Sequence, residues 1–182
     1  MMICFSQNLF VQKNINFMRI IHRFDFKGKD VVKGINFEGL RPIGKIEKLL
    51  EAWSKFDIEE IQFQGATTSL HNTFIDYEIV KITKEKLSIP MTVGGGIKDL
   101  LTAKRLIMQG ADRIAINSAF FENRGFLEET IKDLGESTVV VSIDVSEINK
   151  TFYCFKNNGR ENTGKRLDEY LEDIQKKEIP KY

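Results

Sequence analysis

Short runs of β-branched and apolar residues alternate along the chain with segments whose apolar positions recur every three or four residues. The segment 45–56, for example, places Ile46, Leu50 and Trp53 on one face of a helix. The pattern predicts strands at residues 19–26, 59–65, 91–93, 113–117 and 138–144, and helices at residues 45–56, 74–87, 99–110, 126–135 and 166–177. A small excursion with an Asn-Asn-Gly turn is expected before the last helix. Five βα units in succession, whose strands we expect to be apolar on both faces, are typical of parallel strands covered by helices.

Two architectures fit this alternation, an open doubly wound sheet and a (β/α) barrel. Polar or glycine residues follow nearly every predicted strand at its carboxyl end, which is the end that carries the chemistry in barrels. These residues are Asp25, Gly65 to Ser69, Gly94 to Gly96, Asn117, Ser118 and Asp144. A complete eight-unit barrel needs at least ~200 residues, and the chain has 182. We therefore expect an α/β fold of the (β/α)8 TIM-barrel type that is incomplete, with about five βα units present and strands six to eight missing.

Composition and charge exclude several classes of protein. The chain has 27 Lys and Arg residues against 26 Asp and Glu residues, so no strong overall field attracts nucleic acid or an anionic membrane. No apolar run approaches the ~18 residues that a membrane-spanning helix needs. The two cysteines, Cys4 and Cys154, are expected to be reduced thiols of a cytoplasmic protein. No metal-binding cluster and no redox-cofactor motif is found in the sequence, so we expect neither a metal nor a cofactor.

The domain is expected to span residues 18–182 without an internal linker. Residues 1–17 lack the basic region and the cleavage site of a signal peptide. We expect them to be an N-terminal extension outside the native domain, with translation starting at Met18. At the other end, the sequence stops at Tyr182, where strand six of a barrel should begin, so we expect a C-terminal truncation.

Two aspartates stand at equivalent places in the predicted fold. Asp25 ends the first strand and Asp144 ends the fifth, and these two strands lie opposite each other in an eight-unit barrel. Their carboxylates would face one another across the mouth, which suits general acid and general base chemistry at two ends of one substrate. The alternative is that each aspartate only caps a loop.

The segment Thr-Val-Gly-Gly-Gly-Ile carries the sharpest local signal. Gly94, Gly95 and Gly96 follow a strand and precede a helix, so the backbone can approach a ligand closely and direct its N–H groups at it. Asn117 and Ser118, at the end of the next strand, would add side-chain and backbone donors to the same anion. The sequence therefore predicts a phosphate site, with a tight βα turn as the alternative.

Four segments together resemble the cyclase subunit of imidazole glycerol phosphate synthase, and the likeness covers about residues 18 to 165. The segments are RIIHRFDFKGKDVVKGINFEGLRPIG at 19–44, IPMTVGGGI at 89–97, GADRIAINSAF at 110–120 and TVVVSIDV at 138–145. The resemblance implies a (β/α)8 barrel and a lyase of histidine biosynthesis. In that family, ammonia from a glutaminase (amidotransferase) partner reacts with a phosphorylated aminoimidazole carboxamide nucleotide. The products are imidazole glycerol phosphate and an aminoimidazole carboxamide ribotide.

The resemblance also implies roles for individual residues. Asp25 and Asp144 match the two catalytic aspartates, and Lys33 matches a functional lysine of the first loop. Gly95, Gly96, Asn117 and Ser118, with Gly94 beside them, match one of two phosphate sites. Charged residues that match those around the ammonia entrance, at the opposite end of the barrel, are Arg19, Glu60 and Arg113.

Three alternatives remain open at the level of the sequence. The RFDFKGKDVVKGINFEGLR segment is similar to cyclase-like paralogues that deliver nitrogen to a nucleotide sugar in surface-polysaccharide pathways. The chain could also be an inactive partial barrel that oligomerises. The sister isomerase of histidine biosynthesis ranks third. Two departures from the family pattern stand out, since Gly65 replaces an expected aspartate and Ser146 an expected lysine.

Overall fold

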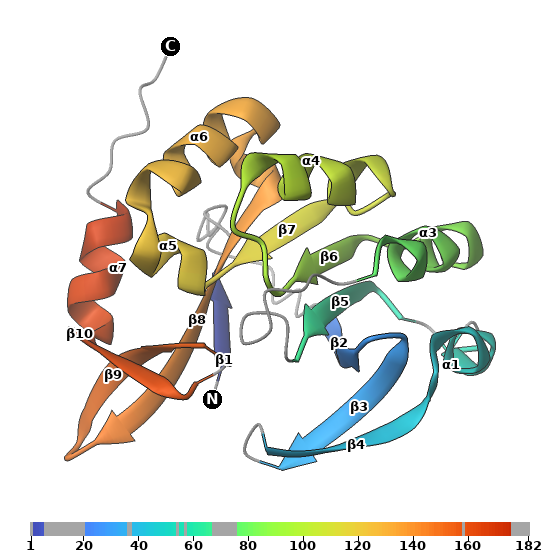
Figure 1. The fold of residues 1–182 in the computed structure, drawn as a ribbon, viewed down its shortest axis with the longest axis horizontal. Coiled ribbons are helices and arrows are strands. Elements are labelled where there is room, and N and C mark those ends of the chain that lie inside the picture. The colour runs from blue at the N-terminus through green and yellow to red at the C-terminus, as the bar shows by residue number, and fades with distance from the viewer. Residues whose placement is uncertain are drawn as a thin grey trace, which may run out of the picture.

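The fold is built around one mixed β-sheet of ten strands, nine of which lie in the order β10-β9-β8-β7-β6-β5-β2-β3-β4, with β1 paired to β8 (Figure 1). It is seen in a computed structural model, which describes residues 2–5, 21–35, 38–53, 55–56, 58–66, 76–157 and 159–175. The five central strands are parallel. They are β2 (Ile21–Lys27), β5 (Glu60–Gly65), β6 (Met91–Gly94), β7 (Arg113–Ile116) and β8 (Val139–Ile148). All five strands predicted from the sequence are thus confirmed.

Helices connect the parallel strands, as the alternating pattern predicts. Figure 1 shows α1, α3, α4 and α6 along one side of the curved sheet. The helices are α1 (Ile46–Trp53), α3 (Tyr77–Lys86), α4 (Leu100–Met108), α5 (Ser118–Glu122), α6 (Arg124–Leu134) and α7 (Leu167–Gln175), with a 3-10 turn at Glu136–Thr138. Of these, the sequence analysis did not anticipate α5. Within the described residues, no helix is long and apolar enough to cross a membrane.

The expectation that the strands are apolar on both faces is wrong. Apolar residues such as Phe63, Val93 and Ile114 are fully buried in the core beneath the helices. The opposite face carries polar residues, because Gln62 pairs in register with Thr92, and Thr92 in turn with Arg113. The sheet therefore has an apolar face that packs against the helices and an opposite face that carries polar side chains.

Two antiparallel hairpins and a short N-terminal strand extend the sheet beyond its parallel centre. Strands β3 (Asp30–Ile35) and β4 (Glu38–Lys45) continue it from β2, and β9 (Thr151–Lys156) and β10 (Glu161–Arg166) continue it from β8. The excursion expected before the last helix is thus confirmed as the hairpin of β9 and β10, with Asn157 and Gly159 between its two strands. Strand β1 (Met2–Phe5) pairs antiparallel with residues 141–144 of β8. Part of the N-terminal extension therefore contributes to the sheet.

The strand count does not support the expectation of a barrel that merely lacks strands six to eight. Among the described residues the sheet has ten strands, because both hairpins and β1 add five antiparallel strands to the five parallel ones that were expected. What the structure establishes is an α/β fold with a sheet rich in parallel strands. The predicted boundary between residues 17 and 18 stays a prediction.

The start and end of α4 follow the sequence signals closely. Asp99 is the N-cap, and its carboxylate accepts hydrogen bonds from the Thr102 backbone N–H at 2.7 Å and from the Thr102 hydroxyl at 2.9 Å. Gly110, just beyond the helix, has a φ of 108°, which a side chain would disfavour. Both ends of this helix fix the β6–α4–β7 connection, which carries the glycine-rich loop.

Candidate active site

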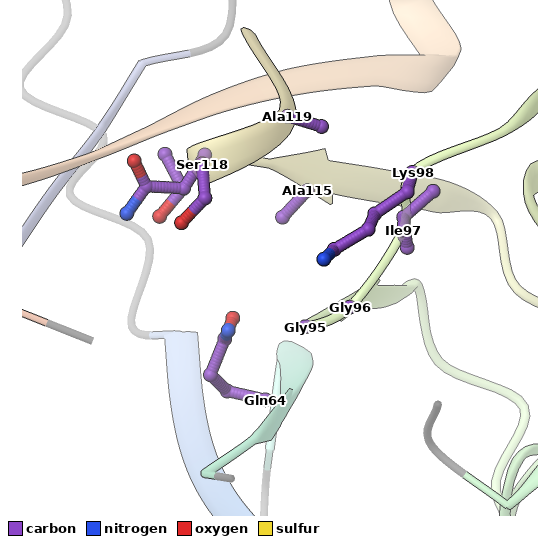
Figure 2. Close-up of a pocket in the computed structure, with 10 residues that line it drawn as sticks. Gln64, Gly95, Gly96, Ile97, Lys98, Ala115, Ser118 and Ala119 are labelled. Carbon is purple, nitrogen blue, oxygen red and sulfur yellow. The ribbon is translucent and has the colours of Figure 1, made fainter. Parts of the chain in front are cut away.

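A pocket opens at the carboxyl ends of β5, β6 and β7, on the polar face of the sheet. It holds about 420 Å³ of empty space that is open to solvent. Ten residues line it, some of them shown with labels in Figure 2: Gln64, Gly95, Gly96, Ile97, Lys98, Ala115, Asn117, Ser118, Ala119 and Ser142. Four of the five residues predicted to bind phosphate are among them, Gly94 being the exception. That these residues bind phosphate stays a prediction.

The three glycines of the loop are required for different structural reasons. A Cβ atom at Gly94 would lie 2.6 Å from the Gln64 Oε1 atom and 2.9 Å from the Ala115 Cβ atom, so the strand end has no room for a side chain. Gly95 and Gly96 have φ angles of 105° and 72°, which favour glycine. The loop therefore brings bare backbone to the wall of the pocket, as a phosphate-binding loop requires.

One of the two N–H donors of the Asn117 side chain is already used within the protein. Its Nδ2 group donates a hydrogen bond of 2.8 Å to the Asp144 Oδ2 atom. The Ser118 hydroxyl oxygen accepts a hydrogen bond of 3.0 Å from the Asn157 backbone N–H, which ties the β9–β10 turn to the start of α5. Because a hydroxyl can donate while it accepts, Ser118 keeps its own proton for a ligand.

Asp144 lies on β8 with only 6% of its surface exposed. Burial raises the pKa of its carboxyl group above the ordinary value of 3.8. The positive charge of Arg23, the hydrogen bond from Asn117 and a backbone hydrogen bond from Gly159 oppose that rise in pKa. The group is thus a carboxyl that holds its proton more firmly than a solvated aspartate does.

Asp25 lies on β2 in different surroundings. Its side chain is one-third exposed, at 33%, and its Oδ1 atom accepts hydrogen bonds from the Arg23 Nε atom at 3.0 Å and the Arg23 Nη2 atom at 2.8 Å. Arg23 is therefore ion-paired to one candidate catalytic aspartate and close enough to act electrostatically on the other. The two carboxyl groups share the polar side of the sheet but differ in burial and charge.

Lys33 is not brought to the pocket. It lies exposed on β3, where its Cα partner on β4 is Arg41, and it is not among the pocket-lining residues. Lys98 is the lysine that lines the pocket, and Figure 2 shows its side chain extending into it. Sequence reasoning missed Lys98 as well as Gln64 and Ser142, although Gln64 stands in an alternating Glu-Ile-Gln-Phe-Gln run that signals a polar inner face.

A second polar cluster lies at the opposite end of the parallel strands. Glu60 is 2% exposed, and its Oε1 atom lies 2.9 Å from the Arg113 Nη1 atom and accepts a 3.3 Å hydrogen bond from the Thr92 hydroxyl. The structure thus joins two of the three residues predicted to surround an ammonia entrance. The third, Arg19, lies outside the described residues. Within the described residues, no three His, Cys, Asp or Glu side chains come together as a metal site.

The comparisons with known proteins agree with the resemblance seen in the sequence. The family model for histidine biosynthesis proteins matches residues 19–182. Subunit HisF of imidazole glycerol phosphate synthase from Thermotoga sp. (strain RQ2) is 36% identical over 159 residues, which cover 87% of this chain and 63% of the relative. The same subunit from Sulfurisphaera tokodaii is 35% identical over 87% of this chain and 64% of the relative.

The subunit from Legionella pneumophila is 36% identical over 148 residues, 81% of this chain and 70% of the relative. The chain thus spans somewhat under two thirds of the length of the first two curated relatives. These relatives give no support to the surface-polysaccharide paralogue, the sister isomerase or an inactive partial barrel. The chain belongs to the histidine biosynthesis protein family, and within it the chain is similar to the HisF subunits of imidazole glycerol phosphate synthase.

Proposed function

We propose that the chain acts as the cyclase subunit of imidazole glycerol phosphate synthase. In this proposal the parallel strands belong to a fold of the TIM-barrel type, the fold class that the family implies. The substrate is a phosphorylated aminoimidazole carboxamide nucleotide, which reacts with ammonia to give imidazole glycerol phosphate and an aminoimidazole carboxamide ribotide. The family membership and the parallel order β2-β5-β6-β7-β8 support this assignment.

The observation that carries the proposal is the pair of aspartates on the polar side of the sheet. Burial raises the pKa of Asp144, which favours a protonated carboxyl group that can act as a general acid. Asp25 is ion-paired to Arg23 and one-third exposed, so its carboxyl group can meet a ligand and take part in proton transfer as the second group of the pair. A cyclisation that releases a second product requires proton transfers at separate atoms of the substrate. Two carboxyl groups that differ in burial and in charged neighbours can carry out these transfers.

The pocket beside Asp144 provides the phosphate anchor in this proposal. The loop at Gly95 and Gly96 offers backbone N–H groups, Ser118 offers a hydroxyl group, and Lys98 offers a positive charge that extends into the same space (Figure 2). Asn117 links the anchor to the chemistry, because it lines the pocket and donates its hydrogen bond to Asp144. A phosphate held there would place the attached carbon skeleton next to the buried carboxyl group.

The ammonia is supplied in this proposal by a glutaminase partner at the other end of the strands. The ion pair between Glu60 and Arg113 lies there, with Glu60 almost completely buried. A buried ion pair is costly unless it is well paired, and in this proposal its polar groups line the route by which ammonia enters. We propose the cytoplasm as the location, in keeping with the buried free thiol of Cys154.

The experiment that tests this function is turnover of the nucleotide substrate with ammonium chloride in place of the glutaminase. Wild-type protein is compared with Asp25→Asn and Asp144→Asn, which keep the shape of each side chain. Asp133→Asn, an exposed position on α6, is the matched control for loss of one negative charge. We expect both active-site variants to lose turnover by at least about 100-fold with little change in melting temperature, and the control to keep it. Absence of turnover in the wild type, or full turnover in Asp144→Asn, refutes the proposal.

A further inference from the structure

Two side-chain oxygens of the pocket residues are buried without a hydrogen-bond donor among the described residues. They are the Gln64 Oε1 atom and the Asn117 Oδ1 atom, and both residues line the pocket. A buried acceptor that is left unpaired destabilises the folded protein, and most such groups in proteins do have a partner. Two of them at one candidate site point to donors that arrive with a ligand.

The orientation of the Asn117 amide follows from its neighbour. Its Nδ2 group is held by the Asp144 carboxyl group at 2.8 Å, so the Oδ1 atom must be the end of the amide that is left without a donor. With the Asp144 carboxyl group ionised, a reversed amide would set two acceptor oxygens against each other. The pairing of β7 with β8 thus sets the orientation of the Asn117 amide, which leaves its Oδ1 atom as a hydrogen-bond acceptor in this part of the pocket.

Gln64 is positioned by close packing. Its Oε1 atom lies so near the Gly94 backbone that a Cβ atom there would be only 2.6 Å away. Figure 2 shows the Gln64 side chain directed into the pocket, across from Ser118, with Gly95 and Gly96 on a neighbouring wall. The absence of a side chain at Gly94 is what lets the Gln64 amide occupy this place.

These acceptors are unsuited to the phosphate group itself. Phosphate oxygens at neutral pH accept hydrogen bonds, so a carbonyl oxygen facing them is repelled. The backbone N–H groups at Gly95 and Gly96 and the Lys98 ammonium group suit the phosphate instead. The pocket thus has a donor part for an anion and an acceptor part for something that carries O–H or N–H groups.

We propose that Gln64 and Asn117 determine specificity by accepting hydrogen bonds from hydroxyl or N–H groups on the carbon skeleton next to the ligand's phosphate. This inference rests on the proposed function, since it takes the phosphate to lie on the glycine loop. The ligand class it names is a phosphate ester of a polyol or of an amide-bearing chain. Esters without such donors leave both acceptors unpaired in a filled pocket and bind more weakly.

The test measures equilibrium binding of two small probes by isothermal titration calorimetry on the full chain. Glycerol 3-phosphate carries hydroxyl groups next to its phosphate, and methyl phosphate carries none. The variant is Gln64→Met, which keeps the length of the side chain and removes the acceptor, and Gln64→Leu replaces it if the first variant does not melt cooperatively. Gln62→Met is the matched control, because Gln62 lies on the same strand and face but outside the pocket lining.

We expect the wild type and the Gln62→Met control to bind glycerol 3-phosphate about tenfold more tightly than methyl phosphate. In Gln64→Met this preference should fall to about threefold or less, with methyl phosphate bound as in the wild type. Equal binding of both probes by the wild type, or an unchanged preference in the variant, overturns the inference and leaves the phosphate site standing. If neither probe binds, the phosphate site of the proposed function is refuted, and this inference with it.

Discussion

Replacing Gly94 by alanine gives the sharpest test of how the pocket wall is built. The added Cβ atom would meet the Gln64 Oε1 atom at 2.6 Å, the Ala115 Cβ atom at 2.9 Å and the Ala115 carbonyl oxygen at 3.2 Å. Gln64 can swing its amide aside, which is a small change. Ala115 cannot, because it is 4% exposed and belongs to β7, whose residues pair directly with Gly94.

The cost of this substitution follows from the contact with Ala115. Two carbon atoms pack best at about 3.5 to 4.0 Å, so β6 and β7 must separate by several tenths of an ångström or more. Overpacking of this kind lowers the free energy of unfolding by about 1–3 kcal/mol. The lower conformational entropy of the unfolded alanine variant raises it by about 0.4–1 kcal/mol. We expect a net loss of about 1–2 kcal/mol in the free energy of unfolding, which corresponds to a melting temperature lower by about 2–8 °C for a chain of this size.

The assay is urea unfolding of wild type and Gly94→Ala, followed by circular dichroism, with Gly125→Ala as the matched control. Gly125 is exposed in α6, and a Cβ atom there would meet only the Asn123 Oδ1 atom, at 3.4 Å. The control should be neutral or stabilised by up to about 1 kcal/mol, as glycine-to-alanine changes in helices are. If Gly94→Ala is as stable as its control, β6 and β7 are not packed as described and the reasoning fails.

Three further predictions concern single side chains. Because burial raises the pKa of Asp144, its folded form binds a proton more tightly than the unfolded chain does, so wild-type stability relative to Asp144→Asn should fall as the pH rises from 3.8 toward the folded pKa. Melting temperatures of both proteins at about pH 4 and about pH 7 check this, and a difference that does not change with pH contradicts it. Asp99→Ala removes the N-cap of α4 and should cost about 1 kcal/mol in urea unfolding, whereas an unchanged midpoint would show that the cap is dispensable. Burial raises the pKa of the Cys154 thiol to about 11, so in a Cys4→Ser background a thiol reagent at about pH 8 should react only as fast as the protein opens. Rapid stoichiometric labelling would show that Cys154 is accessible.

The order of elements could be predicted because each parallel strand is a short apolar run bounded by turn residues. The run Thr-Val-Val-Val before Asp144 and the Asp99 cap of α4 are local signals, and the structure confirms both elements. The β3–β4 hairpin was missed because its glycines and charged residues weaken the strand pattern. Its pairing with β2 is also local, because only Gly28 and Lys29 separate β2 from β3, so the weak strand pattern alone accounts for the miss.

The candidate site could be predicted only in part. A sequence motif predicts where a loop lies in the fold, but it does not predict which side chains form hydrogen bonds with one another. Glycine spacing was enough to place Gly95 and Gly96 in the pocket wall. The hydrogen bond from Asn117 to Asp144 depends on how β7 and β8 pair, and no local pattern encodes it. Lys33 was assigned by resemblance alone, and its exposed place on β3 away from the pocket lining is a result of the hairpin that the sequence analysis missed.

The central claim is that a phosphate ester binds in the pocket next to Asp144. The most direct measurement is a titration of ¹⁵N-labelled protein with glycerol 3-phosphate, followed by amide chemical shifts. The account predicts that the largest shifts fall on the backbone amides of Gly95, Gly96 and Ser118, and that they saturate together. Shifts that are absent from these three amides, or that cluster elsewhere on the chain, would contradict it.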